Sequence, residues 1–278
     1  MTAPAATARE FRQLRDLEVM TWPVFDGLDV DILVTTRHGG VSSGPYASLN
    51  LSLTVGDEPD AVLENRRRVA AALGTEPADL VLAEQVHGGQ AQVVTAADRG
   101  RGARDVADTI PGADALVTTE PGLVLVTQVG DCVPIVLYDP VAGVLASVHA
   151  GWRGTVAGVS RAALEAMASL GSRPADVLAG LGPAIAPDRY QVGPEVAACF
   201  TNPAGILRPD GTGKWLLDLW AANRRLLREA GVPDAQIHVA TVPTGPGPLG
   251  PGPFFSDRTA RPCGRFALVA RLKLRGNP

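Results

Sequence analysis

Short apolar runs recur along the chain, and their length and their content of Val, Ile and Leu predict strands. Four of these runs crowd into residues 115–149, with only short turns between them. Neighbouring parallel strands need a crossover of about a dozen residues or more, so this spacing favours antiparallel or mixed sheets over a doubly wound parallel sheet. The predicted strands cover 30–36, 81–86, 92–95, 115–118, 123–129, 134–138, 144–149, 177–181 and 265–272.

Three other segments carry apolar residues at steps of three and four, which is the period of a helix. The first follows a potential cap at Asp57 and stops at Gly74, and the other two also end at a glycine. The helices are predicted over 59–73, from just after Gly154 to residue 170, and over 218–230. Strands that outnumber helices and do not alternate with them predict an α+β protein of stacked layers.

The chain divides into an N-terminal segment and one folded unit. Residues 1–21 are polar and rich in alanine without strong periodicity, so we expect a loose leader there and a single domain over 22–278. Proline and glycine concentrate at 242–253. Because a strand is predicted directly afterwards, this stretch is interpreted as a surface loop and not as a linker between domains.

Composition excludes several classes of protein. The 278 residues are 46% apolar, and 25 basic against 29 acidic side chains give a net charge of −4. Such mild acidity, without a basic stripe, argues against nucleic acid or an anionic membrane as the main partner. No apolar run is long enough to span a bilayer, and three distant cysteines do not make a disulfide framework. We expect a cytoplasmic enzyme; nothing indicates its oligomeric state.

Histidine is scarce, with four in the chain, and two of the four sit with a cysteine in similar settings. His87, Cys132 and His149 each lie at the end of a predicted strand, close to a glycine. Two imidazoles and a thiolate are a familiar ligand set for zinc, and a fourth position left to water makes such a site catalytic. Separations of 45 and 17 residues match no short zinc motif. A small buried cysteine and two imidazoles bonded to carbonyl groups therefore remain an alternative.

The same residues allow a different chemistry. Cys132 as nucleophile and His149 as base would resemble the arrangement of acyl-transfer enzymes. A metal ion would consume the thiolate and the imidazole lone pairs, so the two interpretations exclude each other.

Other polar residues are candidates for binding. Arg37 enters a turn rich in glycine and serine that could hold a phosphate or simply turn the chain. Asn50, between two leucines, could bond a substrate or the loop backbone. Arg153, at the mouth of a predicted helix, would attract an anion or form a surface ion pair. Arg258, after an aromatic pair, could reach the same cleft.

In combination, these motifs resemble the YfiH/laccase-domain family, whose members are also called polyphenol oxidase or peptidoglycan editing factor family proteins. The resemblance runs from about residue 24 to 272 and rests on six segments that occur in order. They are TTRHGGVSSGPYASLNLSLTVGDEPDAVLENRRRVAAALG, LAEQVHG, GDCVPIVLYDP, VHAGWRG, GLGPAIAPDRYQVGPEV and FFSDR, the last followed by GR before the final strand.

The resemblance implies a four-layer α-β-β-α fold with mixed sheets, shared with bacterial toxin-type deamidases. It also implies a zinc ion held by His87, Cys132 and His149. The implied activity is that of a purine nucleoside phosphorylase acting on adenosine, inosine and methylthioadenosine, with adenosine deaminase activity in the same pocket. Oxidation by a copper cluster is not expected, because such a cluster needs many imidazole ligands and the chain has four histidines.

Two stretches depart from the family pattern. The expected Thr-Ala-Asp-Cys run reads QVGDC at 128–132, and the stretch after the aromatic pair reads RTARP at 258–262. The cysteine and the aspartate before it are retained, whereas substrate contacts near 257–263 are expected to differ.

For phosphorolysis we expect zinc, Arg37 and Arg153 to place and neutralise phosphate, and we expect Asn50, Gln85 and Arg258 to bind substrate. Deamination needs a carboxylate that moves protons, and Asp131 and Glu84 are the candidates. Strand parity disfavours Glu84 only weakly. Residues 84 and 87 would point to opposite faces of an unbroken strand, but Asp131 and Cys132 are also an odd number of positions apart, so both candidates stay open.

Two alternatives remain. The first is a Cys132/His149 hydrolase or amidase that edits peptidoglycan precursors. The second is a binding or regulatory module without enzymatic activity, with a vestigial metal site.

Overall fold

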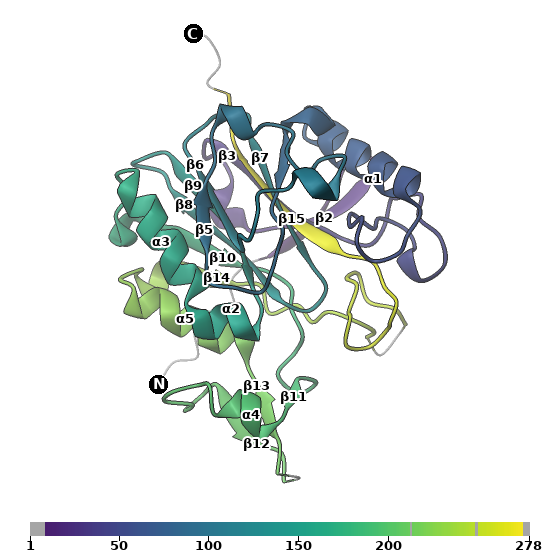
Figure 1. Cartoon of the computed structure of the whole chain (residues 1–278). Helices are drawn as coiled ribbons and strands as arrows, with labels where there is room; N and C mark the ends of the chain where they lie inside the picture. Colours follow the sequence, from purple (N-terminus) through teal and green to yellow (C-terminus); the bar gives the residue numbers. More distant parts are fainter. Residues whose placement is uncertain (1–8, 212, 248–249, 275–278) are drawn as a thin grey trace.

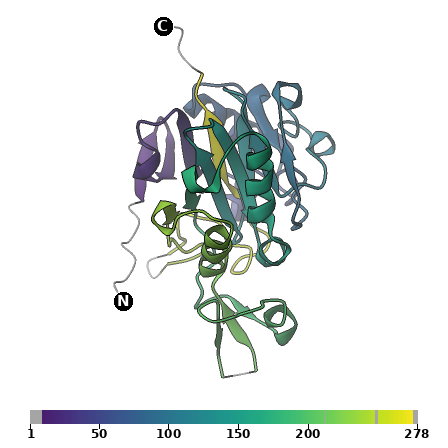
Figure 2. The same ribbon diagram turned by 90° about the vertical axis from the view of Figure 1, so that its left-hand side faces the viewer.

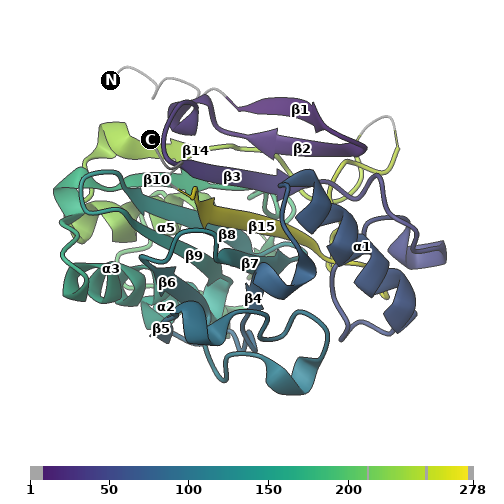
Figure 3. The same ribbon diagram turned by 90° about the horizontal axis from the view of Figure 1, so that it is seen from above.

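Two six-stranded sheets packed face to face form the centre of the protein, as the views in Figures 1 and 3 show. The computed structural model describes residues 9–211, 213–247 and 250–274. Helix α1 (Pro59–Ala72) packs on the outer face of the first sheet, and α3 (Val159–Ser169) with α5 (Leu219–Glu229) covers the outer face of the second. The layers therefore follow the order α-β-β-α, and the chain has the single-domain α+β fold that the family resemblance implied.

Both sheets are mixed, as the crowding of predicted strands indicated. The first has the order β1 (Glu10–Leu14), β2 (Leu17–Thr21), β3 (Val30–Thr35), β15 (Phe266–Leu272), β7 (Val124–Val129) and β4 (Leu80–Leu82). The second has the order β14 (Ile237–Val239), β10 (Leu178–Leu181), β8 (Val133–Asp139), β9 (Val144–Ala150), β6 (Ala115–Thr118) and β5 (Ala91–Val93). Antiparallel pairs dominate the centres of both sheets, while β4, β5 and β14 add parallel edges.

Three apolar clusters separate the four layers. Side chains between the sheets, such as Leu125, Phe266 and Leu268, are completely buried. A second cluster lies under α3 and α5, and a third under α1. Strands buried on both faces carry continuous apolar runs without alternation, which explains why the central strands were predicted within one or two residues of their observed bounds.

Two predicted elements have different bounds in the structure. Strand β4 stops at Leu82, so the chain from 83 to 87 is not regular strand and the parity argument against Glu84 does not apply. The helix predicted after Gly154 already begins at Trp152 and is broken at Gly158, whose φ of 80° lies in the left-handed region. This break separates α2 (Trp152–Ala157) from α3.

The expectation of a loose leader over residues 1–21 is wrong for residues 10–21. These residues form the hairpin β1–β2, which extends the first sheet beside β3. Leu17, Val19 and Met20 are buried against the sheet and α1, which offsets the entropy lost on ordering the segment. Residues 1–8 lie outside the described part of the chain.

A small third sheet projects from the body of the molecule (Figures 1 and 2). It has the order β11 (Gln191–Val192), β13 (Trp215–Leu217) and β12 (Leu207–Pro209), and α4 (Pro194–Ala197) lies beside it. No strand was predicted here. Within the described residues, no helix has the length and hydropathy required to cross a membrane.

The hairpin supplies the first prediction. We expect Met20→Ala to lower the free energy of unfolding by about 2–5 kcal/mol, because the side chain is fully buried. The exposed Gln13→Ala should stay within about 0.5 kcal/mol of the parent protein. Urea unfolding measures both, and equal stability of the two variants would show that the hairpin is not part of the cooperative unit.

Candidate metal centre and active-site cavity

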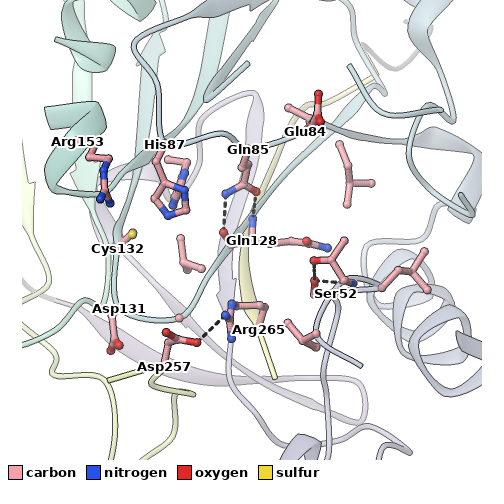
Figure 4. A pocket seen from close by; sticks show the side chains of 18 of the residues that line it. Ser52, Glu84, Gln85, His87, Gln128, Asp131, Cys132, Arg153, Asp257 and Arg265 are labelled. Atoms are coloured by element: carbon pink, nitrogen blue, oxygen red, sulfur yellow. Dashed lines mark hydrogen bonds and ion pairs between the residues drawn. The ribbon is translucent and has the colours of Figure 1, made fainter. Parts of the chain in front are cut away.

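A cavity of about 520 Å³ opens where β4, β7 and β9 end and β8 begins (Figure 4). Loops from both sheets line it, together with the start of α2 and the segment before β15. Strand ends are rigid supports for side chains that must keep fixed positions, so this is the natural place for chemistry in such a fold.

The three residues predicted as metal ligands meet in this cavity. His87 comes from the turn after β4, Cys132 from the turn between β7 and β8, and His149 from β9. Their ligand atoms all lie within 4.8 Å of one another, and the two imidazole rings meet edge to face with centroids 4.7 Å apart. The group could therefore hold one metal ion.

Asp114, just before β6, fastens two of these residues. Its fully buried carboxylate accepts a hydrogen bond from Nδ1 of His149 at 2.8 Å. It also accepts hydrogen bonds from the backbone amides of His87 at 3.0 Å and Gly88 at 2.6 Å. The bond to His149 fixes the tautomer whose Nε2 is left as a ligand. The amide bonds hold the turn in which His87 has a φ of 60°, a conformation that costs about 1–3 kcal/mol.

Sequence reasoning missed Asp114. The one indication in the sequence is that Asp114 directly precedes the fully buried strand β6. An acidic residue at such a position is usually an ordinary turn residue. Burial would raise the pKa of Asp114, but the hydrogen bond and the charge of His149, together with the amide hydrogen bonds of Gly88 and His87, outweigh burial and lower that pKa.

The two imidazoles favour the negatively charged form of the Cys132 sulfur, which is the form that binds a metal cation. Burial alone would raise the pKa of the Cys132 thiol, but the charges and hydrogen bonds of His149 and His87 outweigh it and lower the pKa to about 6. Burial likewise opposes protonation of His149, while Cys132 and Asp114 raise its pKa to about 9. The thiolate that a metal ion requires is thus already favoured at neutral pH.

Gly151 leaves room for the group. A Cβ atom at this position would lie 2.8 Å from Sγ of Cys132 and 3.2 Å from Cδ2 of His87. The chemistry of the donors, the fixed tautomer of His149 and this open space together fit a metal ion held by the three residues.

Five arginines line the cavity, and they differ in what their N–H groups do. Arg261 and Arg265 form ion pairs with Asp257, and Arg66 bonds backbone carbonyl groups. Arg153 and Arg258 instead stack on aromatic rings, at 4.4 Å from the centroid of Trp152 and 5.0 Å from that of Tyr190. Stacking uses the face of a guanidinium and leaves its N–H groups available to a ligand, although Nη1 of Arg258 already donates to the carbonyl of Gln191 at 3.1 Å.

Two residues expected at the site do not line the cavity. Arg37 stacks on Phe255 at 4.5 Å and donates from Nε to the Ala47 carbonyl. Asn50 is completely buried and bonds the backbone of Ser52 and Arg265, so it satisfies the loop backbone, the second of its two possible roles. Local sequence cannot tell which of two neighbouring turns faces the cleft.

Gln85 lines the cavity, but both ends of its amide are engaged. Nε2 donates to the carbonyl of Gln128 at 2.7 Å, and Oε1 accepts from the amide of Gln128 at 2.8 Å. The pair, shown by dashed lines in Figure 4, joins the turn after β4 to β7.

The two candidate proton carriers are placed differently. Asp131, with a φ of 127°, accepts from the Thr244 hydroxyl at 2.5 Å and from the Arg258 amide at 2.6 Å, one bond to each oxygen. Burial raises its pKa. Glu84 accepts from the Gly112 amide through Oε2, and Figure 4 shows it on the far side of Gln85 from His87.

Comparison with known proteins places the chain in a family. The profile of a family described as "Multi-copper polyphenol oxidoreductase laccase" matches residues 31–273. The chain belongs to this laccase-like YfiH family. The resemblance inferred from the sequence motifs is thereby confirmed.

Individual relatives are similar over most of their length. The chain is 42% identical over 213 residues to "Purine nucleoside phosphorylase YlmD" of Geobacillus stearothermophilus, covering 74% of this chain and 78% of the relative. It is 38% identical to "Adenosine deaminase RL5" of an unknown prokaryotic organism, covering 75% and 81%. The crystal structure of YlmD from Geobacillus stearothermophilus superposes with a TM-score of 0.88 at 37% identity, covering 95% of this chain and 99% of that one.

The family description mentions several copper ions, but this chain has too few histidines in the cavity to bind them. Of its four histidines, His38 and His238 do not line the cavity. One thiolate and two imidazoles can hold a single ion, but they cannot furnish a cluster of several copper ions.

Asp114 is the basis of a prediction about metal affinity. We expect Asp114→Asn to weaken zinc binding about 10–100-fold, because an amide NH₂ would oppose the donors that the carboxylate now accepts. Zinc competition against a chromophoric chelator measures the effect. Asp139→Asn is the matched control, since Asp139 is also buried and accepts backbone amides but lies outside the cavity. Its zinc affinity should equal that of the parent, and unchanged affinity in Asp114→Asn would contradict the role given to Asp114.

Gly151→Ala tests the space beside the ligands. The added methyl group should displace Cys132 or His87 and lower the zinc retained after dialysis, while the circular dichroism spectrum stays the same. Gly247→Ala serves as control, because a Cβ there would meet nothing within 4 Å. Full zinc retention in Gly151→Ala would mean that the ligands do not converge as described.

Proposed function

We propose that the protein is a zinc-dependent purine nucleoside phosphorylase that acts on adenosine, inosine and methylthioadenosine, with adenosine deamination as a side activity. The observation that carries the proposal is the convergence of His87, Cys132 and His149 in a cavity that arginines line. The names of relatives that are 38–42% identical support the substrate class.

The ligand set supports zinc as the ion. A thiolate with two imidazoles combines soft and borderline donors, which suits zinc, and three protein ligands leave one position open. Zinc bound there would supply a Lewis acid that stabilises negative charge as the glycosidic bond breaks.

The surrounding residues orient the substrate. Arg153 has guanidinium N–H groups that bond no described residue, and Arg258 keeps Nε and Nη2 for a ligand while its Nη1 donates to the Gln191 carbonyl. Such donors match the acceptor atoms of a purine ring. Asp131 acts on Arg258, because its carboxylate holds the backbone of that residue and the hydroxyl of Thr244 together. We therefore assign Asp131 a positioning role, in place of the proton transfer expected from its sequence.

The arrangement of carboxylates favours phosphorolysis over deamination as the main activity. Among the described residues, the ligand group contains no carboxylate. The oxygens of Asp114 and Asp131 are engaged, and Glu84 lies beyond Gln85. Deamination depends on a carboxylate that exchanges protons beside the ion, whereas phosphorolysis depends mainly on placement and charge.

One observation favours a second candidate, a cysteine hydrolase or amidase of peptidoglycan precursors. Cys132, His149 and Asp114 form a chain in which the thiolate meets an imidazole that a buried carboxylate orients. This is the logic of a nucleophile, a base and an orienting acid. The second imidazole, His87, has no function in such a triad but completes a set of metal ligands.

Adenosine incubations with and without phosphate test the proposal. Zinc-loaded protein should release adenine and ribose 1-phosphate only when phosphate is present, and chromatography identifies both products. Cys132→Ser should lose zinc and lower turnover about 100-fold or more, because a bound Lewis acid contributes several kcal/mol. Cys199→Ser, an exposed thiol outside the cavity, should behave as the parent does.

The alternatives give different results. Hydrolysis of a peptidoglycan precursor that survives a chelator but not thiol alkylation, measured in the Cys199→Ser background, would identify the cysteine hydrolase. Absence of product from every nucleoside at full zinc occupancy would favour a regulatory module with a vestigial site. Turnover that persists in Cys132→Ser after loss of zinc would contradict the proposed function.

A further inference from the structure

Arg66, on α1, is a buried cation that forms no ion pair with any residue that the structure describes. The residue is only 5% exposed. Nε donates to the Leu51 carbonyl at 2.9 Å, and Nη1 donates to the carbonyls of Gly102 and Ala103 at 2.7 and 2.9 Å. Nη2 bonds no described residue, and the side chain lines the cavity.

A buried charge is costly unless a counter-charge accompanies it. Two partly buried arginines have one: Arg265 pairs with Asp257, and Arg271 pairs with Asp31. Arg66 has neutral carbonyl partners, and burial alone acts on its pKa, lowering it to about 10. An anion in the cavity would supply the missing charge, and the carbonyl groups already fix the guanidinium in place to receive it.

The position of Arg66 relative to the metal ligands follows from shared contacts. The Leu51 carbonyl accepts from Nε of Arg66 and also from Nε2 of Gln128, at 2.6 Å. Gln128 in turn pairs with Gln85, two residues before His87. The glutamine pair therefore separates the Arg66 end of the cavity from the metal-ligand end, and Figure 4 shows Ser52 and His87 on opposite sides of that pair.

Hydroxyl groups accompany Arg66 at its end of the cavity. Ser52 and Thr54 line the cavity with their hydroxyl oxygens 3.0 Å apart, next to the loop whose Leu51 carbonyl holds Arg66. A guanidinium with a free nitrogen and two adjacent hydroxyl groups is a donor set that suits a tetrahedral oxyanion.

We propose that the Arg66 end of the cavity is the subsite for inorganic phosphate, an assignment that rests on the proposed phosphorylase function. A phosphate oxygen forms a bond to C1′ of the nucleoside while the bond from C1′ to N9 of the purine breaks. The electron pair of that bond leaves with the purine, and the proton of HPO₄²⁻ ends on the purine nitrogen, so that ribose 1-phosphate and a neutral purine result. The sugar then lies between Arg66 and the metal ligands, and the purine lies toward Arg153 and Arg258.

Phosphate binding without nucleoside tests the subsite directly. Inorganic phosphate is titrated into zinc-loaded protein by isothermal calorimetry, with Arg66→Met, Arg66→Lys and Arg153→Met compared with the parent. We expect Arg66→Met to weaken phosphate about tenfold or more and Arg153→Met to leave its affinity within about twofold. Arg66→Lys keeps a charge that can bond the carbonyls, so it guards against misfolding of the methionine variant. It should weaken phosphate several-fold, because the fork of donors is lost.

The outcomes separate the subsite from the function. The subsite would be overturned if Arg153→Met lost phosphate affinity while both Arg66 variants kept the affinity of the parent. It would also be overturned if phosphate binding disappeared on removal of zinc and did not change in the Arg66 variants. Phosphorolysis with an unchanged KM for phosphate in Arg66→Lys would also overturn the subsite while leaving the function intact. Phosphate binding that depends on Arg66, in a protein that does not cleave adenosine, would uphold an anion subsite and refute the function.

Discussion

The structure of the site depends on one buried carboxylate. Asp114 joins the imidazole of His149, on a central strand, to the turn that carries His87, on a loop from the other sheet. Without it, the left-handed backbone of His87 would lack its anchor and His149 could rotate or change tautomer. The burial of this carboxylate is tolerated because its oxygens accept hydrogen bonds from the His149 ring and from the backbone amides of His87 and Gly88. The hydrogen bonds of Asp114 thus connect elements of the two sheets at the place where His87, Cys132 and His149 converge.

Charge along the cavity is arranged in a consistent way. At one end, a thiolate and two imidazoles form a group that is ready for a cation. At the other, Arg66 carries a positive charge whose hydrogen-bond partners, among the described residues, are neutral carbonyl groups. Between them, Gln85 and Gln128 are neutral and pair with each other. This arrangement of charge suits a reaction in which an anion attacks and negative charge develops on the leaving group. Phosphorolysis of a purine nucleoside is such a reaction.

The sequence predicted the layers, and it singled out the three residues that meet in the cavity, because both depend on local signals. Continuous apolar runs identify buried strands, and scarce residues such as His87, Cys132 and His149 stand out wherever they occur. It did not predict what depends on tertiary contacts. The hairpin over 10–21 is ordered by the sheet beside it, although its own pattern is mostly polar.

Residues of common type gave the weakest signals. Asp114 reads as an ordinary turn residue, and Arg66 stands in a run of three arginines that resembles a solvated helix face. Arg37 and Asn50 carry motifs that suggest binding, but they fold away from the cavity and support its loops. Which polar residue meets the ligand is decided by the direction in which each loop returns, and that direction is set by contacts between distant segments.

The most direct test of the account is the zinc K-edge X-ray absorption spectrum of the purified protein. We predict one equivalent of zinc with one sulfur ligand at about 2.3 Å and two imidazole nitrogens at about 2.0–2.1 Å. The sulfur contribution should be absent in Cys132→Ser. A spectrum without sulfur in the parent protein, or with a sulfur contribution that survives this substitution, would contradict the assignment of the metal centre.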